Sequence, residues 1–226
     1  MVRIMSHVKI LLTILFIAEL TSLSFFAGCI KQDIQLEGVE VREYQGEKLS
    51  SVNDFSENSI KGPQYVNKTT YQLKITGLVK TPKNYTYDEV LNSYQHYKKV
   101  VTLDCVEGWS VTILWEGILV LDIIDESEPL SNATVVIFKA IDGYTTSFPL
   151  NYIQSNNIIL AHRMNNVTIP SERGFPFQLV SESKWGYKWI KWVTEIELSN
   201  NTQYKGYWES RGYSNSGYLN NSFFGP

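Results

Sequence analysis

The sequence has few of the residues from which common catalytic and metal sites are built. Its 226 residues include only two cysteines, Cys29 and Cys105, and three histidines, His7, His96 and His162. No Cys-x-x-Cys or His-x-x-x-His spacing occurs, so the sequence predicts no zinc site.

Other motifs are missing as well. The sequence has no Gly-rich phosphate loop of the P-loop or dinucleotide type and no Gly-x-Ser-x-Gly turn. The formal net charge is -3, which provides no basic surface for nucleic acid, so we expect no nucleic-acid partner. Hydrophobic residues make up 43% of the chain and charged residues 19%, which is enough apolar material for a folded core. The 14 tyrosines and six tryptophans are typical of a β-rich fold with aromatic-lined pockets.

The N-terminal residues have the features of an export signal. Arg3 and Lys9 accompany an apolar run, and the stretch from Phe26 to Cys29 resembles a lipobox. We expect residues 1–28 to be a lipoprotein-type signal peptide and Cys29 to be lipidated. An uncleaved single-span anchor and plain secretion remain open. All three place the body of the protein outside the cytoplasm, and the first two also hold it at the cell membrane.

The rest of the chain divides into three parts. Residues 29–59 are polar with little periodicity, and we interpret them as a polar tether. Residues 60–213 carry the predicted domain, and residues 214–226 are a C-terminal tail. Short apolar runs of β type outnumber helical patterns, so the fold class is α+β, a β-rich mixed fold.

Turn and cap residues indicate where some of the predicted helices and strands begin and end. Thr86 has the character of an N-cap before a helix over 87–93, with acidic residues in the first turn. Asp142-Gly143 predicts a hairpin turn between two strands. The predicted strands, including the two that flank this turn, cover residues 71–79, 99–106, 133–140, 144–148, 158–161, 175–180 and 192–198.

Cys105 follows a β-type run and precedes a Gly-Trp pair that breaks the run. A turn after a strand presents a side chain on a rigid support. A thiolate there favours soft or transition metals over magnesium and calcium. The competing interpretation is a small buried core thiol, since free cysteine is among the most buried residue types.

A second stretch, residues 184–192, alternates lysines with tryptophans and a tyrosine around Gly186. Ammonium groups can bind a phosphate and aromatic rings can stack on a planar ligand, so this stretch is typical of a site for an anionic, planar molecule. A solvated strand with one aromatic face would have the same pattern. Arg173, in the turn before Pro176, is a lesser basic candidate.

Several motifs in one order resemble a known family. They are Leu73-x-Ile75-x-Gly77-Leu78-Val79, residues 103–110 around Cys105, Asp142-Gly143-Tyr144-Thr145-Thr146, residues 160–165, Arg173-Gly174-x-Pro176, residues 186–192 and residues 206–213. Together they are similar to the molybdopterin-binding domain of the sulfite oxidase family. They are closest to the branch that contains the bacterial periplasmic methionine-sulfoxide reductase catalytic subunit.

This resemblance implies a cofactor, molybdenum bound to molybdopterin, and a set of site residues. Cys105 falls at the position of the thiolate that ligates the metal, which agrees with its place after a strand. Glu107 falls where the reductase branch has a carboxylate near the metal, so both residues are catalytic candidates. The remaining cofactor-binding candidates implied by the resemblance are Arg173, Lys188, Lys191, His162 and Arg163.

The sequence also departs from the family. The sulfite oxidases carry an arginine beside the cysteine, whereas Val106 to Trp109 follow it here, so we expect reduction of an S-oxide or N-oxide, small or protein-bound, rather than sulfite oxidation. No Cys-x-x-Cys-His haem motif is present, and we expect a separate electron-donor protein. The signal lacks a twin-arginine pair. The alternative is therefore a non-catalytic cell-surface binding module with an empty or altered site.

Overall fold

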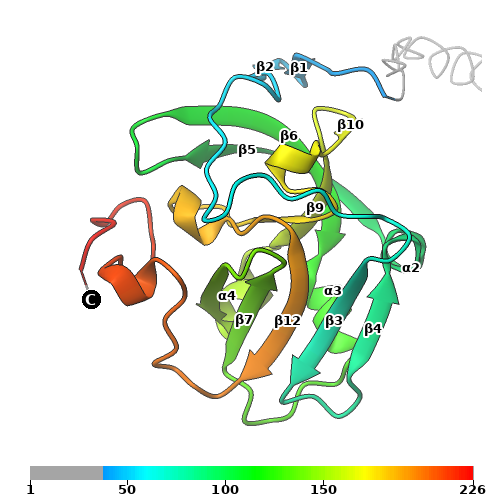
Figure 1. Ribbon diagram of the computed structural model, residues 1–226, viewed down its shortest axis with the longest axis vertical. Helices are drawn as coiled ribbons and strands as arrows, with labels where there is room; N and C mark the ends of the chain where they lie inside the picture. The colour runs from blue at the N-terminus through cyan, green and yellow to red at the C-terminus, as the bar shows by residue number, and fades with distance from the viewer. Residues whose placement is uncertain (1–37, 226) are drawn as a thin grey trace, which may run out of the picture. The chain divides into compact units, whose positions relative to one another are not determined.

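The computed structural model describes residues 38–225; the predicted signal peptide, Cys29 and the first part of the predicted tether lie outside the described residues. Among the residues described, no helix has the length and apolar character needed to cross a membrane. The frame consists of two five-stranded sheets (Figure 1).

The first sheet has the order β4-β3-β12-β7-β8. Its strands are β3 (Gln72–Gly77), β4 (Lys83–Thr86), β7 (Val135–Ala140), β8 (Thr145–Pro149) and β12 (Val193–Ser199). Strand β12 pairs in parallel with β3, and the other neighbours are antiparallel. The pairing of β12 between β3 and β7 joins the last strand of the chain to earlier ones. The predicted hairpin at Asp142-Gly143 is confirmed, because β7 and β8 pair across it.

The second sheet has the order β10-β9-β6-β5, and β11 also pairs with β9. Its strands are β5 (His96–Asp104), β6 (Ser110–Leu119), β9 (Ile159–Met164), β10 (Val167–Thr168) and β11 (Gln178–Val180). All the pairings are antiparallel. The longest ladder joins β5 to β6, so the chain runs out along β5, turns at Cys105 and returns.

The helices are short. They are α2 (Tyr87–Ser93), α3 (Val120–Asp125) and α4 (Leu150–Ser155), with 3-10 turns η1 (Ser171–Arg173), η2 (Gly186–Lys188) and η3 (Glu209–Arg211). The predicted helix after Thr86 is confirmed as α2. Its start is a capping box, in which the Thr86 hydroxyl accepts from the Glu89 backbone N–H and the Glu89 carboxylate accepts from the Thr86 N–H.

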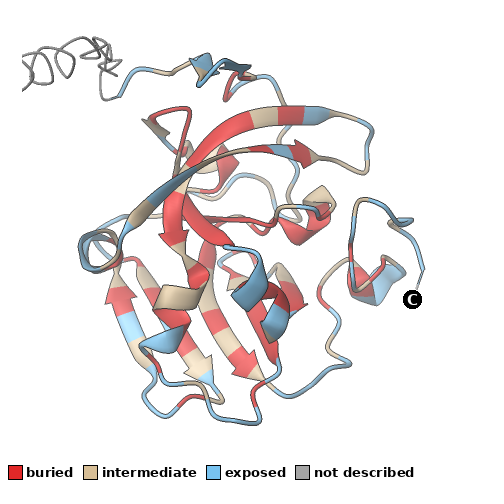
Figure 2. Cartoon of the chain, turned by 180° about the vertical axis from the view of Figure 1, so that it is seen from behind, coloured by how far each residue is buried: buried red, intermediate tan, exposed pale blue. Residues whose placement is uncertain are grey.

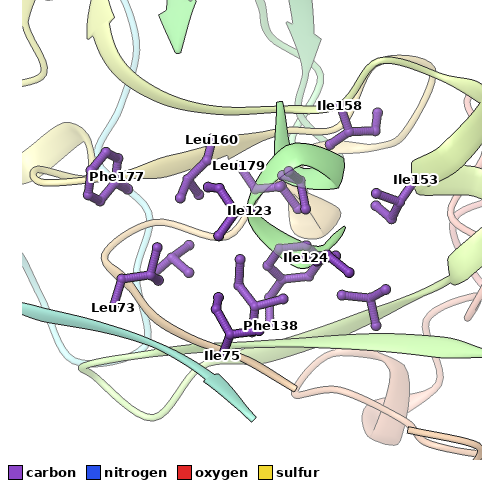
Figure 3. Close-up of a cluster of buried hydrophobic side chains, with 14 of the residues drawn as sticks. Leu73, Ile75, Ile123, Ile124, Phe138, Ile153, Ile158, Leu160, Phe177 and Leu179 are labelled. Carbon is purple, nitrogen blue, oxygen red and sulfur yellow. The ribbon is translucent and has the colours of Figure 1, made fainter. Parts of the chain in front are cut away.

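The core follows from the alternation of side chains along the strands. On β3, Leu73 and Ile75 are fully buried while Lys74 between them is exposed, so one face of the sheet is apolar (Figure 2). That face meets side chains from α3, β9 and β11, among them Ile123, Leu160 and Leu179 (Figure 3). The predicted β-rich α+β class is confirmed.

The predicted tether over residues 29–59 does not agree with the structure where the structure describes it. A small hairpin of β1 (Glu43–Tyr44) and β2 (Glu47–Lys48) is followed by residues that pack on the second sheet. Leu49 and Val52 are buried, and Val52 belongs to the apolar cluster on that sheet. The folded body therefore begins before residue 60. Too few apolar residues lie in this segment to produce a recognisable periodicity, and part of its attachment is by backbone hydrogen bonds such as that from Ser50 N–H to the Thr112 carbonyl.

The predicted tail over residues 214–226 is also part of the folded body. The Trp185 N–H donates to the Gly217 carbonyl at 2.9 Å, and the Lys184 ammonium donates to the Ser216 carbonyl at 2.6 Å. Tyr187 donates its hydroxyl to the Ser214 carbonyl at 2.7 Å. The segment is held through backbone carbonyls, which any residue type provides, so its composition gives no sign of the contact.

Candidate functional site

Cys105 is the first residue of the five-residue loop that joins β5 to β6. The Cys105 N–H donates to the Trp109 carbonyl at 2.9 Å, and the Gly108 N–H donates to the Cys105 carbonyl at 3.0 Å. Gly108 has a φ of +87°, in the region that favours glycine. The ladder below the loop continues to the pair Asp104–Ser110. Because the loop is closed at both ends, the thiol has a fixed place at the end of a sheet.

A cavity of about 400 Å³ opens beside this loop. Its volume lies within the usual range for small-molecule and cofactor sites, roughly 300–1,000 Å³. The predicted site residues that line it are Cys105, Glu107, Arg173 and Lys191. The structure therefore brings these four together from three separate parts of the chain.

Asn58 links the two catalytic candidates. Its side-chain amide lies 3.7 Å from Cys105 Sγ and donates to Glu107 Oε2 at 3.0 Å. Trp109 Nε1 donates to the same Glu107 oxygen at 3.2 Å, and these two hydrogen bonds lower the pKa of Glu107. Burial, with a smaller contribution from the Glu107 charge, raises the pKa of the Cys105 thiol, although backbone and Asn58 hydrogen bonds oppose it. Sequence reasoning missed Asn58 because it lies in the segment interpreted as a tether.

Arg173 and Lys191 form the cationic side of the cavity. The Arg173 guanidinium donates through Nε to the Val52 carbonyl at 3.0 Å and lies over the Phe55 ring. Its Nη1 is buried and has no hydrogen-bond partner among the described residues. Lys191 Nζ donates to Glu57 Oε1 at 2.6 Å, and burial lowers the pKa of this lysine. Burying a guanidinium nitrogen without a hydrogen-bond partner in a cavity wall destabilises the fold, unless an anionic group binds it.

The close approach of residues 184–192 to the Cys105 loop depends on Gly186. A Cβ on Gly186 would lie 3.2 Å from the Asp104 carbonyl oxygen and 3.5 Å from Cys105 Cα. The lysine-aromatic stretch is therefore a wall of the cavity, to which Tyr187, Trp189 and Trp192 contribute rings. A cationic wall, aromatic rings and a thiol together fit an anionic planar cofactor with a soft metal.

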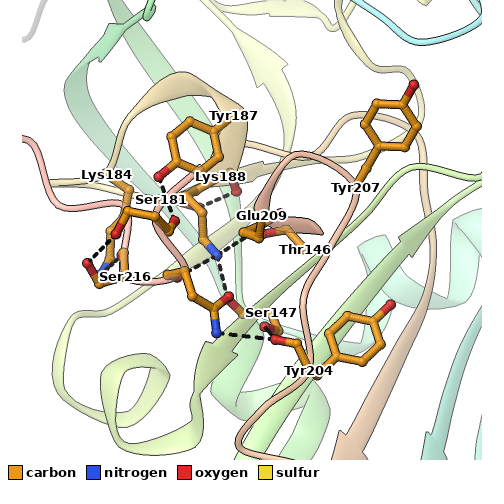
Figure 4. Close-up of polar contacts among 12 residues, drawn as sticks. Thr146, Ser147, Ser181, Lys184, Tyr187, Lys188, Tyr204, Tyr207, Glu209 and Ser216 are labelled. Atoms are coloured by element: carbon orange, nitrogen blue, oxygen red, sulfur yellow. Dashed lines mark hydrogen bonds and ion pairs between the residues drawn. The ribbon is translucent and has the colours of Figure 1, made fainter. Parts of the chain in front are cut away.

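Lys188, predicted to bind the cofactor, does not line this cavity. Its side chain is fully buried, and its ammonium donates to Glu209 Oε1 and to the Ser147 carbonyl, each at 2.7 Å (Figure 4). A third donation reaches the Asn215 carbonyl at 3.1 Å. All three ammonium hydrogens therefore have partners inside the protein, and none is left for a phosphate. Lys188 is the last residue of the turn η2, and Lys191, three residues later, lines the cavity instead.

His162 and Arg163 also lie outside the cavity. Both are on β9, in the middle of the second sheet, where His162 is buried. His162 lies against His96, and Arg163 donates to the Asn166 carbonyl at 2.6 Å. Strand β9 thus places both side chains away from the cavity that contains Cys105.

Comparison with known proteins supports the family and the fold. Residues 60–208 match the family model described as oxidoreductase molybdopterin binding domain. An uncharacterised oxidoreductase of Bacillus subtilis is 30% identical over 152 residues, which cover 67% of this chain and 76% of the relative. The protein-methionine-sulfoxide reductase catalytic subunit of Gluconobacter oxydans is 29% identical over 145 residues, 57% of this chain and 46% of that protein. This chain thus spans about half the length of that reductase.

A solved structure supports the same fold. The sulfane dehydrogenase SoxCD from Paracoccus pantotrophus superposes with a TM-score of 0.64 at 17% identity, covering 84% of this chain and 58% of that one. The order of motifs, the fold and the match over residues 60–208 lead to one conclusion: the chain belongs to the oxidoreductase molybdopterin-binding domain family, of the sulfite oxidase type, and is a molybdenum-cofactor-dependent oxidoreductase.

Proposed function

We propose that the protein is an extracytoplasmic reductase of S-oxides or N-oxides, with Cys105 as the thiolate ligand of molybdenum. One observation carries this proposal: the side-chain amide of Asn58 contacts both Cys105 and Glu107 at the edge of the cavity. Support for the substrate class comes from the relative in Gluconobacter oxydans, whose name states methionine-sulfoxide reduction.

The bound cofactor supplies two-electron chemistry and transfer of an oxygen atom. Cys105 offers the soft anionic sulfur that such a metal prefers, and the loop holds it with no freedom beyond its own side-chain torsion. The Asn58 amide directs an N–H toward Cys105 Sγ and would thereby hold the sulfur in one orientation. Arg173 Nη1 and the Lys191 ammonium would hold the phosphate of the pterin.

Glu107 would act on the substrate side. Reduction of an S-oxide consumes two electrons and two protons and releases water. The lowered pKa keeps Glu107 as a carboxylate at neutral pH, so it accepts rather than donates a hydrogen bond there. It would orient the water or the protonated group that delivers protons to the departing oxygen. An arginine at this position would instead favour an anionic substrate, so the carboxylate favours a neutral oxide.

We further propose that the two electrons come from a separate protein and that the enzyme is held at the outer face of the cell membrane. Another relative, from Azospira oryzae, is named a putative protein-methionine-sulfoxide reductase subunit. The lipobox-like stretch ending at Cys29 supports lipid attachment. Labelling with a radioactive fatty acid, with Cys29→Ala as the comparison, tests the anchor; equal labelling of both proteins would refute it.

The central experiment is metal and pterin analysis of full-length protein made in a molybdenum-competent host, followed by oxidation of a reduced viologen dye by sulfoxides and N-oxides. We expect one molybdenum and one pterin per chain, with turnover. Cys105→Ser should lose the metal and turnover, whereas Thr102→Ser, on the exposed face of β5, should keep both. Loaded protein without turnover would refute the reductase assignment. Folded protein without molybdenum would support the non-catalytic binding module.

A further inference from the structure

Outside the cofactor cavity, three ligand-type side chains meet on the second sheet. They are His96 at the start of β5, Glu116 on β6 and His162 on β9. Their ligand atoms all lie within 4.8 Å of one another. His96 and Cys105 lie at opposite ends of β5, which at about 3.3 Å per residue puts them roughly 30 Å apart. The cluster is therefore separate from the molybdenum site.

The hydrogen bonds of His96 prepare it as a metal ligand. Its Nε2 lies 2.8 Å from the Leu91 carbonyl oxygen, which can only accept, so Nε2 carries the proton. The other ring nitrogen, Nδ1, then presents a lone pair toward Glu116 and His162. Metal-binding histidines commonly have this arrangement, with a carbonyl fixing the tautomer of the ring.

The remaining two side chains face the same point. His162 Nε2 lies 3.2 Å from His96 Nδ1, and Glu116 Oε1 lies 3.7 Å from that atom. Two ligands of tetrahedral zinc, each about 2.0–2.1 Å from the ion, are about 3.3 Å apart. The two observed separations lie on either side of that value. Rotation of the Glu116 side chain would bring its carboxylate to a similar separation from His162.

One oxygen of the cluster lacks a hydrogen bond within residues 38–225. Glu116 Oε2 is buried without a hydrogen-bond partner among the described residues, and the Glu116 side chain is only 12% exposed. Lys98 Nζ forms an ion pair with this oxygen at 3.4 Å.

We propose that His96, Glu116 and His162 form a second metal site, which takes a divalent transition ion such as Zn²⁺ with a fourth position open to water. Two imidazoles and one carboxylate are a common ligand set for such ions. The sequence predicts no zinc site because the ligands are 20 and 46 residues apart along the chain, and only the β5-β6-β9 pairing joins them. His96 is 31% exposed and provides the route of entry.

The test is Zn²⁺ titration by calorimetry of the molybdenum-loaded, untagged full-length protein after chelator treatment. We expect one Zn²⁺ per chain. Loss of a supporting contact commonly weakens metal binding about 10–100-fold, so Glu116→Gln, which removes a ligand, should cost at least as much. Lys98→Met should strengthen binding, because the competing ammonium is gone.

Controls separate this site from ordinary surface binding. Glu197→Gln, a strand carboxylate paired with Lys139 in the other sheet, should leave the affinity unchanged. If Glu116→Gln does not fold, His96→Gln at the more exposed ligand replaces it. Co²⁺ in place of Zn²⁺ should give a difference spectrum typical of a low-coordinate site without a thiolate charge-transfer band. Cys105→Ser, although it should lose molybdenum, should give the same Co²⁺ difference spectrum. Absence of stoichiometric binding, binding indifferent to Glu116→Gln and His96→Gln, or a thiolate band would overturn the proposal.

Discussion

The buried ion pair between Lys188 and Glu209 allows a decisive test of what Lys188 does. Both side chains are fully buried, and their charged atoms are 2.7 Å apart. Thr146 also donates to the same Glu209 oxygen, at 2.6 Å. The pair connects the stretch after β11 to η3, and thus to the C-terminal segment. Burial lowers the pKa of Lys188, and the Glu209 carboxylate opposes this lowering.

Replacing Lys188 with methionine keeps most of the volume and removes the charge. Glu209 would then be a buried carboxylate without an ion-pair partner among residues 38–225, and removal of one partner of a buried pair typically costs about 3–5 kcal/mol. For a chain of this size each 1 kcal/mol lowers Tm by about 2–4 °C, so we expect a decrease of roughly 10 °C. In the double variant Lys188→Met/Glu209→Gln no charge is left unpaired, so it should recover a large part of the loss.

Urea unfolding followed by tryptophan fluorescence measures these differences, with Lys205→Met, at an exposed position, as the control. The cofactor content of the folded fraction is measured in the same samples. Should Lys188→Met lose the pterin while its unfolding free energy stays within about 1 kcal/mol of the wild type, a value too small for an unpaired buried charge, the ion-pair reasoning would be refuted. The cofactor role implied by family resemblance would then hold for Lys188.

Three further predictions follow from single contacts. Asn58→Leu removes the amide beside Cys105 and should weaken retention of molybdenum about 10–100-fold, measured by metal analysis after dialysis, with little change in Tm. Lys184 has its pKa lowered to about 7 by burial, so the unfolded chain binds more protons above that pH, and stability should rise from pH 7 to 9. Allowing for solvent screening, the rise is about 1–2 kcal/mol and should vanish in Lys184→Met, as shown by urea unfolding at each pH. Gly117→Ala would place a Cβ 2.4 Å from the Leu160 carbonyl oxygen and should destabilise the fold by about 1–3 kcal/mol in the same assay.

Each of these has a clear contrary result. Asn58→Asp keeps the size of the side chain but adds a charge beside Glu107, so metal retention equal to that of the wild type in Asn58→Asp and Asn58→Leu would refute the role of the amide. A pH dependence that persists in Lys184→Met would mean that another group titrates. A Gly117→Ala protein as stable as the wild type would show that β6 and β9 can separate without cost at that point.

The sequence located the elements whose signals are local. The helix after Thr86 begins where a capping box predicts it, because the residues that make the box are three apart. The hairpin at Asp142-Gly143 is set by the turn itself. The place of Cys105 at a strand-to-loop junction follows for the same reason, since the break after the strand lies within four residues of the thiol. Strand β4 and helix α4 were not predicted, as both are short and stabilised by packing.

The sequence alone did not identify which side chains lie around Cys105. Lys188 and Lys191 are three residues apart and look equivalent there, yet one is enclosed by Glu209 and the other lines the cavity. Which lysine meets a carboxylate depends on residues far away along the chain. The same holds for the segment around Asn58, whose composition is polar and whose role comes from the surface on which it lies.

By itself, the sequence determined the family, the cofactor class and the position of the thiol, because ordered motifs and local turn chemistry carry that information. The tertiary structure alone decided which residues share the cavity with Cys105, that Leu49, Val52 and the segment around Ser216 pack on the folded body, and that His96, Glu116 and His162 meet. The physical reason is that strand pairing and burial bring together residues that are far apart in the sequence. No pattern of near neighbours specifies which distant side chain will satisfy a buried charge or complete a ligand set.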